Sequence, residues 1–296
     1  MSKFKSVGAI LMLLSLLSCY LLISCEKERN GYSVPNGGAH FSLNWNRIWF
    51  WQPKPETVKM LLFPQSGTEN QTGEISADGG TLPALPVNEY QFIALSGNLT
   101  DKFYRGLGNY ATAEIYLQER TDREGVTLVY PPLLLYGSSG QLAVKPERLS
   151  ETEVQPVSLV KSLSFRIKMI GNDRVEKCTA RLSGVAKGVR LSSRIPVDCT
   201  ASTDFELFKL ISDYTGQVHV FGFDTTDKSA MLTITCTSGD SRKTVTVDLT
   251  DRIELFHVDA LSCTIEIDYQ NPDTGLTPSV TITDWQVGNF GNIELE

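Results

Sequence analysis

The chain has 296 residues, of which 41% are hydrophobic and 21% charged, and its net charge at pH 7 is −7. These fractions are close to globular averages, which argues against a disordered chain and against a protein of many membrane spans. An acidic chain without a stripe of clustered Lys and Arg also lacks the electrostatic basis for binding nucleic acid. The length suits two β-domains that each bury a core.

The N-terminus has the pattern of a signal peptide. Two lysines among the first five residues precede an uncharged run of apolar and small residues that ends at Ser24. The run closes with Leu22-Ile23-Ser24-Cys25, which resembles the lipobox of bacterial lipoproteins. We therefore expect residues 1–24 to be a signal peptide that is cleaved after the small Ser24, with the thiol of Cys25 carrying the lipid.

Other interpretations of this segment remain open. Leu16-Leu17-Ser18-Cys19 is a second lipobox, but cleavage there would leave an apolar leader at residues 20–23, whereas Cys25 is followed at once by four charged residues. Residues 1–24 could also be an ordinary cleaved signal peptide or an uncleaved anchor helix. The run is short for a spanning helix, which needs ~20 apolar residues. Two or three acyl chains, each methylene contributing about 0.8 kcal/mol, would hold the protein at a membrane.

Strand signals dominate the first half from about residue 39. Phe41, Leu43 and Trp45 alternate with polar residues, the period of a half-buried strand. Further strands are predicted over 58–63, 90–95 and 113–117. Four prolines between residues 131 and 156 surround a predicted turn at 137–140, and this proline density is typical of edges and connections. We place a domain boundary here, with an N-terminal domain at 25–155 and a C-terminal domain at 156–296.

The second half alternates more regularly, as expected for antiparallel sheets with one face in a core. Five segments share this pattern: Leu163–Met169, Cys178–Leu182, Leu232–Cys236, Val245–Leu249 and Cys263–Tyr269. One helix is predicted over Asp204–Tyr214, where apolar residues recur at helical spacing. The fold class expected is therefore all-β, with two tandem antiparallel β-sandwich domains.

Two groups of side chains are candidates for sites. Cys178, Cys199, Cys236 and Cys263 allow three disulfide pairings, among which the sequence does not choose, and buried free thiols suit the pattern equally. Their spacing lacks the close Cys pairs of a zinc site. Trp45, Trp49 and Trp51 form an aromatic patch that could stack on a sugar or peptide, although packing near a strand end is the favoured interpretation.

No pattern predicts catalysis. The three histidines are isolated from one another, and a solitary histidine on a strand is typically a structural residue. Asp273-Thr274-Gly275 has the letters of the aspartic-protease triplet, but it follows Asn271-Pro272 between two predicted strands, where a turn is favoured. We therefore expect no enzyme activity, no cofactor and no metal.

The order of motifs resembles a known family. The lipobox is followed by the strand ending at Trp45, by Pro-Glu-Thr-Val-Lys-Met-Leu-Leu-Phe-Pro at 55–64, by Pro-Val-Asn-Glu-Tyr at 86–90, by Leu-Ser-Gly-Val-Ala at 182–186 and by Asp-Trp-Gln-Val-Gly at 284–288. This order is similar to that of the FimB/Mfa2-like fimbrial anchor and accessory lipoproteins of Bacteroidetes.

The resemblance implies two transthyretin-like sandwiches, lipid attachment to the outer membrane and display at the cell surface. It also implies a role as an anchor or accessory subunit whose partners are other fimbrial subunits, joined by insertion of a strand at an open edge. Only eight residues follow Gly288, so we expect the chain to accept a strand and not to donate one. The alternative function is a surface glycan-binding lipoprotein of a polysaccharide-uptake system.

Overall fold

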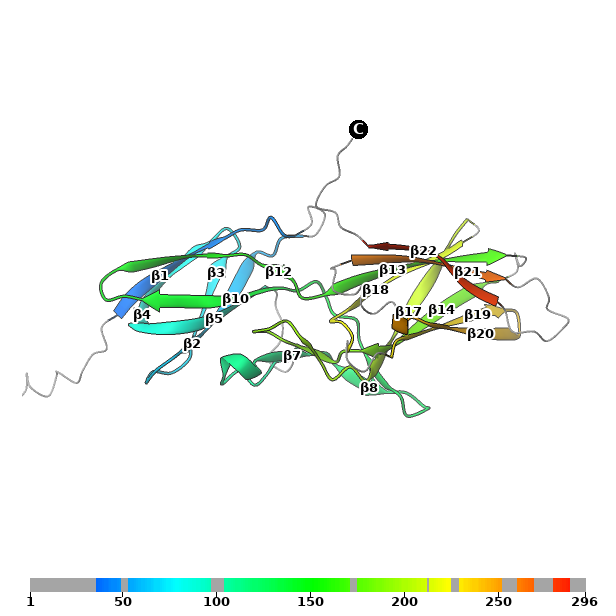
Figure 1. Cartoon of the computed structure of the whole chain (residues 1–296), viewed down its shortest axis with the longest axis horizontal. Coiled ribbons are helices and arrows are strands. Elements are labelled where there is room, and N and C mark those ends of the chain that lie inside the picture. The colour runs from blue at the N-terminus through cyan, green and yellow to red at the C-terminus, as the bar shows by residue number, and fades with distance from the viewer. Residues whose placement is uncertain are drawn as a thin grey trace, which may run out of the picture.

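The protein is described here by a computed structural model that covers residues 36–48, 53–96, 104–170, 175–211, 213–224, 229–251, 260–268 and 279–287. Within these ranges the regular structure consists of strands and short 3₁₀ turns, among them η2 (Tyr110–Thr112) (Figure 1). The all-β prediction is therefore confirmed. Among the described residues there is no helix with the length and apolar character that crossing a bilayer requires.

The first half consists of two sheets packed face to face, on the left of Figure 1. One sheet has the order β11 (Leu149–Val154), β1 (Asn36–Leu43), β4 (Gly80–Pro86). The other has the order β12 (Val157–Ser158), β10 (Tyr136–Val144), β5 (Asn88–Ser96), β2 (Thr57–Pro64), β3 (Gln71–Ser76). Their facing side chains form one core, so this half is a sandwich.

Strand β1 shows why this sequence adopts a strand. Ala39 and Phe41 are fully buried while the alternate side chains face outward, as the period-two pattern predicted. Phe41 meets Phe92 of the facing sheet edge-on, with ring centroids 5.8 Å apart. Strand β1 lies between β4, to which it is antiparallel, and β11, to which it is parallel.

The predicted turn at residues 137–140 is wrong, because these residues form part of β10. They pair with β5 from Gly137, opposite Leu95, to Gly140, opposite Phe92. A Cβ on Gly140 would lie 2.7 Å from the Phe92 ring, and one on Gly137 would lie 2.8 Å from Leu159. These glycines therefore leave room for large neighbouring side chains instead of reversing the chain.

The second half, on the right of Figure 1, consists of strands that form one continuous, folded-over sheet. The order is β20 (Ser241–Asp248), β19 (Met231–Ser238), β14 (Lys177–Val185), β17 (Ala201–Leu210), β18 (Asp213–Val220), β13 (Lys161–Ile170), β21 (Ala260–Asp268), β22 (Ser279–Val287). Most pairs are antiparallel, and β13 with β21 is parallel. The five alternating segments of the sequence lie in β13, β14, β19, β20 and β21 and supply most of the core.

The predicted helix at Asp204–Tyr214 is also wrong. The segment forms β17, a turn and β18, and the end of β17 pairs with the start of β18. Of the three residues at helical spacing, Phe205 is 9% exposed, but Phe208 and Ile211 are 65% and 93% exposed. The helical spacing was coincidental, because Phe208 and Ile211 lie on a hairpin that extends beyond the core.

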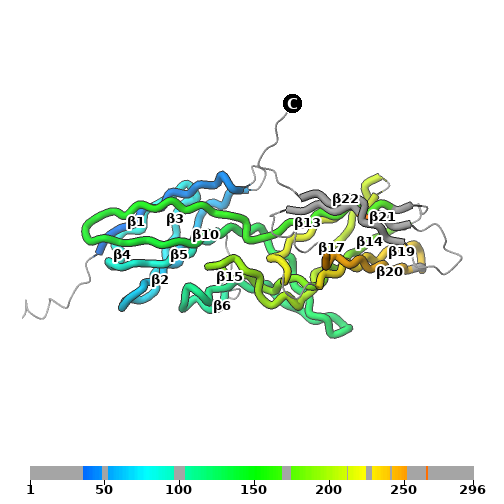
Figure 2. Tube along the Cα trace, viewed as in Figure 1, coloured from blue at the N-terminus to red at the C-terminus, as the bar shows by residue number. Residues whose placement is uncertain are grey.

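A third, smaller sheet lies beneath the junction of the two halves (Figure 2). Its order is β16 (Pro196–Val197), β15 (Gly188–Arg190), β7 (Glu114–Tyr116), β6 (Tyr104–Arg105). Nearby, β8 (Glu119–Thr121) pairs with β9 (Thr127–Val129), which pairs with β17. Residues 104–129 thus pair with strands of the second half. The boundary at 155/156 and the transthyretin-like topology stay predictions.

Candidate functional site

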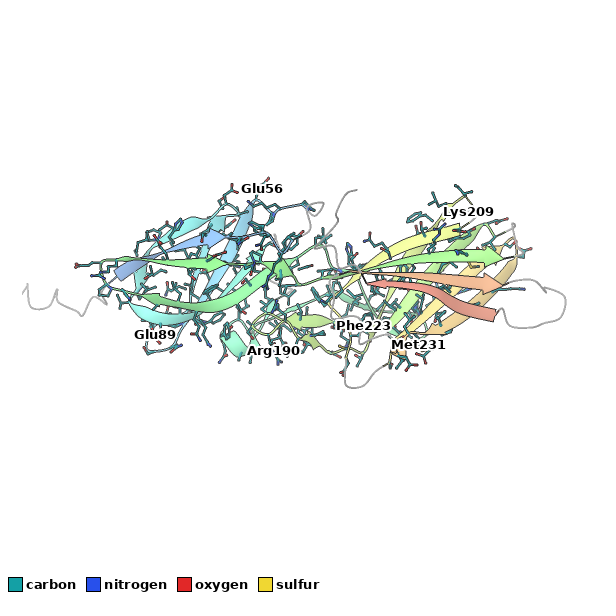
Figure 3. The ribbon with its side chains drawn as sticks, turned by 45° about the horizontal axis from the view of Figure 1, so that its top comes forward. Glu56, Glu89, Arg190, Lys209, Phe223 and Met231 are labelled. Carbon is teal, nitrogen blue, oxygen red and sulfur yellow. A yellow bond between two sulfur atoms is a disulfide. The ribbon has the colours of Figure 1, made fainter. Side chains whose placement is uncertain are left out.

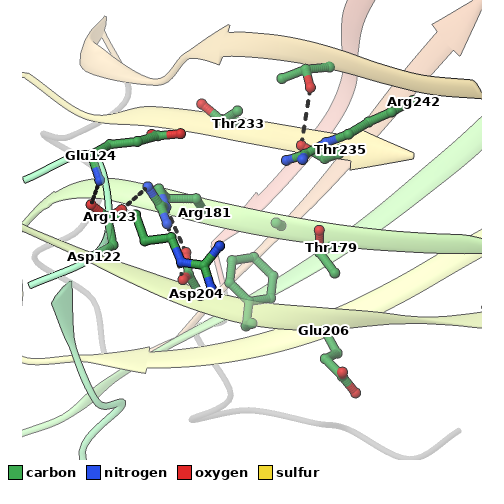
Figure 4. A pocket seen from close by; sticks show the side chains of 13 residues that line it. Asp122, Arg123, Glu124, Thr179, Arg181, Asp204, Glu206, Thr233, Thr235 and Arg242 are labelled. Atoms are coloured by element: carbon green, nitrogen blue, oxygen red, sulfur yellow. Dashed lines mark hydrogen bonds and ion pairs between the residues drawn. The ribbon is translucent and has the colours of Figure 1, made fainter. Parts of the chain in front are cut away.

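A polar depression of about 730 Å³ lies on the outer face of the second half, where the loop between β8 and β9 stands over β14, β17, β19 and β20 (Figure 4). Its lining consists mainly of threonine hydroxyls and of charged side chains of both signs. Phe205 also contributes to the lining, although it packs into the core. The depression therefore offers hydrogen-bonding groups together with a comparable extent of apolar surface.

Arg181 is the centre of this depression. Its Nε donates to Oδ1 of Asp204 at 2.7 Å, its Nη2 donates to Oδ2 of the same carboxylate at 3.2 Å, and its Nη1 donates to Asp122 at 2.8 Å. These bonds raise the pKa of Arg181, and the hydrogen bond that Arg181 donates to Asp204 is the largest cause. Arg181 therefore connects the β8–β9 loop to the face of the sheet.

Asp122 also shapes the loop itself. One of its oxygens accepts the backbone N–H groups of Glu124 and Val126, each at 2.9 Å. The Val126 bond is the first cause, and the Arg181 contact a further cause, of the lowered pKa of the Asp122 carboxyl. Gly125 has a φ of 82°, which permits the tight return of the chain. Asp122 of the loop, Arg181 of β14 and Asp204 of β17 thus form one ion-pair cluster.

Among the described strands, the long strand β20 ends its sheet and is paired along one edge only. It pairs with β19 through a two-residue turn at Gly239-Asp240, and no other described strand pairs with it. Leu249 donates its N–H to Ala230, so odd-numbered residues of β20 face β19 and even-numbered ones face away. The backbone groups of Thr244 and Thr246 therefore point to the free edge. This geometry can accept an added strand.

The structure describes one residue of the predicted aromatic patch, Trp45. Trp45 is partly buried against the first core, donates its Nε1–H to the carbonyl of Ala77 at 2.7 Å, and meets Tyr136 edge-on. Trp49 and Trp51 lie outside the described residues. Trp45 therefore packs at a strand end, while a contact role for the patch stays a prediction.

The four candidate cysteines differ in their surroundings. Cys178 on β14 and Cys236 on β19 are opposite each other, with Cα atoms 4.3 Å apart, and form a disulfide. Cys199 is a half-buried free thiol, and burial raises its pKa to about 12. Cys263 lies in β21 opposite Phe165. Which of the four cysteines are paired in the cell stays a prediction.

The lipobox residues Ser24 and Cys25 lie outside the described residues, as does the Asp273–Gly275 triplet. In the part of the chain that the structure describes, no three His, Cys, Asp or Glu side chains come together in a group that could hold a metal ion.

Sequence reasoning missed both the ion-pair cluster and the free edge. Arg181 is 59 positions from Asp122 and 23 positions from Asp204, so no local sequence pattern indicates that they form a cluster. Strand β20 did show a local pattern, because threonine alternates with valine from Thr244 to Val247. This alternation indicates one buried and one exposed face. Whether a strand lies at an edge depends on topology, which alternation does not indicate.

Over the residues that the structure describes, the chain is thus an all-β protein of two packed-sheet halves in which the long strand β20 is paired along one edge only. Residues 52–289 match the sequence profile of the fimbrillin-A associated anchor proteins Mfa1 and Mfa2, and the chain belongs to that family. The resemblance inferred from the sequence is confirmed. Membership implies a fimbrial or adhesive role, association with other fimbrial subunits and a location at the cell surface.

Solved structures share the fold at low sequence identity. A candidate adhesin from Bacteroides ovatus ATCC 8483 is 20% identical, with a TM-score of 0.61 over 75% of this chain and 86% of that chain. The fimbrial anchor protein Mfa2 from Porphyromonas gingivalis is 12% identical, with a TM-score of 0.55 over 85% and 99%. A candidate polysaccharide-binding protein from Bacteroides thetaiotaomicron is 11% identical, with a TM-score of 0.57 over 84% and 96%. No protein with a curated description matches.

Proposed function

We propose that the protein is a lipid-anchored subunit of a cell-surface fimbrium, attached to the outer membrane through Cys25 and joined to other subunits by strand addition. The family match over residues 52–289 carries the fimbrial part of this proposal. The lipobox at residues 22–25 supports the lipid, and the free edge of β20 supports the mode of assembly. The role is assembly and attachment, without catalysis.

The chemistry of strand addition suits β20. An added strand would pair with the outward N–H and C=O groups of Thr244 and Thr246, which makes binding depend on main-chain hydrogen bonds. On the inner side, Val245 and Val247 remain buried in the core, so the edge can be extended without exposing apolar side chains. Charged residues at the start of the strand, Arg242 and Lys243, would discourage unspecific pairing.

A proline at position 246 tests this edge. Thr246→Pro removes one outward N–H and leaves the hydrogen bonds between β19 and β20 in place, because the N–H of residue 246 faces away from β19. The control, Thr246→Val, keeps the N–H and loses only the hydroxyl contact with Thr233. After gentle crosslinking in the native strain, we expect tagged Thr246→Pro to recover less of the other fimbrial subunits than Thr246→Val.

The thermal unfolding midpoint of each variant shows whether the fold is retained. Equal recovery of subunits by a folded Thr246→Pro protein and by the unchanged protein would contradict assembly at this edge. Recovery of a porin-like transporter and glycan-binding neighbours would overturn the fimbrial proposal in favour of the glycan-binding alternative.

The lipid is tested separately. We expect Cys25→Ala to abolish incorporation of a labelled fatty acid and to move the protein out of the outer-membrane fraction. Cys19→Ala is the matched control, because it removes the competing lipobox and should leave both measurements unchanged. The opposite pattern would assign the lipid to Cys19.

A further inference from the structure

We infer that β1 and β11 form a tension clamp, a pair of parallel strands that bears load between the membrane end of the protein and its second half. This inference rests on the proposed function in one respect, which is that tension enters the fold through the start of β1. A subunit held by lipid at one end and by a fimbrium elsewhere is pulled along its length.

The path of the load follows from strand direction. Strand β1 begins at the outer end of the first half, and both β1 and β11 run toward the second half (Figure 1). The chain then passes from Val154 through β12 into β13. Figure 3 places Glu89 and Lys209 toward opposite ends of the molecule, so the two halves lie in line. Tension therefore pulls β1 backward at its first residue and β11 forward at its last.

Parallel pairing decides how the hydrogen bonds are loaded. The ladder runs from Gly38, opposite Leu149, to Leu43, opposite Val154. Its flanking bonds are Gly38 N–H to the Arg148 carbonyl at 3.1 Å and Asn44 N–H to the Val154 carbonyl at 2.9 Å. Because the two strands are pulled at opposite ends, all of these bonds are sheared together. In an antiparallel hairpin pulled at its open end they would break one after another.

Side chains reinforce the end of the ladder that faces the second half. The Asn44 side chain donates to Glu153 at 2.7 Å, and the Gln155 side chain donates to Asn46 at 2.6 Å. A side-chain hydrogen bond between the two segments therefore lies on each side of Val154. Sliding β1 out would also expose Ala39 and Phe41, both fully buried. Strand β4 holds the other edge of β1.

The second half repeats this arrangement. Strand β13, into which the load passes, lies between antiparallel β18 and parallel β21. Its pairing with β21 extends from Ser162, opposite Ala260, to Ile170, opposite Asp268. Each half thus begins with a strand that is bonded on both edges and is parallel to a later strand.

Single-molecule force spectroscopy of the mature chain tests the clamp. One geometry holds the protein by its N-terminus and by Asp240→Cys in the exposed β19–β20 turn, with Cys25→Ser, Cys199→Ser and Cys263→Ser to avoid a second attachment. The other moves the first handle to Asp78, whose side chain is 88% exposed in the β3–β4 turn. Loading from residue 78 bypasses the β1–β11 ladder. We expect the first half, identified by its released length, to unfold at a higher force in the first geometry.

Two matched prolines locate the effect. By the alternation set by Gly38 and Asn44, the N–H of Thr152 faces β1, whereas that of Glu151 faces the outer edge of β11. Thr152→Pro should lower the peak force toward that of the second geometry, and Glu151→Pro should not. If Thr152→Pro does not fold, Asn44→Ala, which removes the tie to Glu153, should lower the peak by a smaller amount.

Equal peak forces in the two geometries would overturn the clamp, as would equal effects of the two prolines. The measurement needs no fimbrial partner, so its failure would leave the proposed strand addition standing. Conversely, failure to recover fimbrial subunits in the native strain would leave a measured clamp standing.

Discussion

At the scale of single residues, Arg181 joins segments that are distant in sequence. Its guanidinium holds Asp204 with two hydrogen bonds and Asp122 with one, and it is 31% exposed. Arg120 contacts the same Asp204 at 3.4 Å from a more exposed position. The geometry and burial of Arg181 indicate that its contacts contribute more to stability than those of Arg120.

We predict that Arg181→Ala lowers the free energy of unfolding by about 1–3 kcal/mol, because it leaves two carboxylates without their shared partner. Arg120→Ala should cost only about 0–1 kcal/mol, the range of an exposed ion pair. Urea unfolding of both variants measures the difference. Equal losses would show that the cluster does not hold the β8–β9 loop.

The disulfide is a second feature at this scale. Cys178 and Cys236 are separated by 58 positions, and both side chains are buried. We predict that the Cys178→Ala/Cys236→Ala double variant loses up to about 4 kcal/mol of stability, the loop-entropy value for a closure of this length. Cys199→Ser, the control, should stay within about 1 kcal/mol of the unchanged protein. Urea midpoints without reductant test both, and equal midpoints for the two variants would contradict the pairing.

At the scale of elements, β17 shows how topology overrides local periodicity. Its first part pairs with β14 and β9, and its end pairs with β18. The strand therefore connects the β14 side of the folded-over sheet to the β18 side. Phe205 stacks on Phe165 inside the core, with ring centroids 5.5 Å apart. Phe208, three residues later, is outside the core.

This difference gives a prediction for the two phenylalanines. Phe205→Ala should destabilise the protein by about 3–5 kcal/mol, because it leaves a cavity beside Phe165. Phe208→Ala should change stability by about 0.5 kcal/mol or less, since its ring is largely in water. Thermal and urea unfolding distinguish the two. Similar losses would favour a helix that buries both rings.

At the scale of the whole molecule, the junction between the halves has a core of its own. Leu61 and Ile93 of the first half pack with Ile115 of β7 and with Val189 and Phe221 of the second half. Ser139 also donates to the carbonyl of Ser192 across the junction. The two halves therefore share buried surface, and we expect their stabilities to be coupled.

Ile115 and Ile75 test this coupling, because both are buried but only Ile115 belongs to the junction core. Ile115→Ala should lower stability by about 2–5 kcal/mol and reduce amide-exchange protection in both halves. Ile75→Ala should have a similar cost and act first on the first half. Hydrogen exchange read by mass spectrometry resolves the two patterns. Loss of protection confined to the second half in Ile115→Ala would show that the halves are independent.

The class and most of the strands could be predicted from the amino-acid sequence alone. Alternation from Phe41 and from Leu163 predicted buried faces, because the period of side chains along a strand is a local property. The motif order predicted the fimbrial anchor family. Lipidation at Cys25 is a prediction made at the same level.

Which strands pair, and in which direction, follows from the three-dimensional fold and not from any local pattern. The partner of β1, the free edge of β20 and the Asp122–Arg181–Asp204 cluster all join residues far apart in the chain. At Gly137–Gly140 and at Phe205–Ile211 the local pattern was misleading. At Gly137–Gly140 the conformation depends on the neighbouring side chains of Phe92 and Leu159. At Phe205–Ile211 it depends on pairing with β14 and β18. Both sets of neighbours are brought there by the fold.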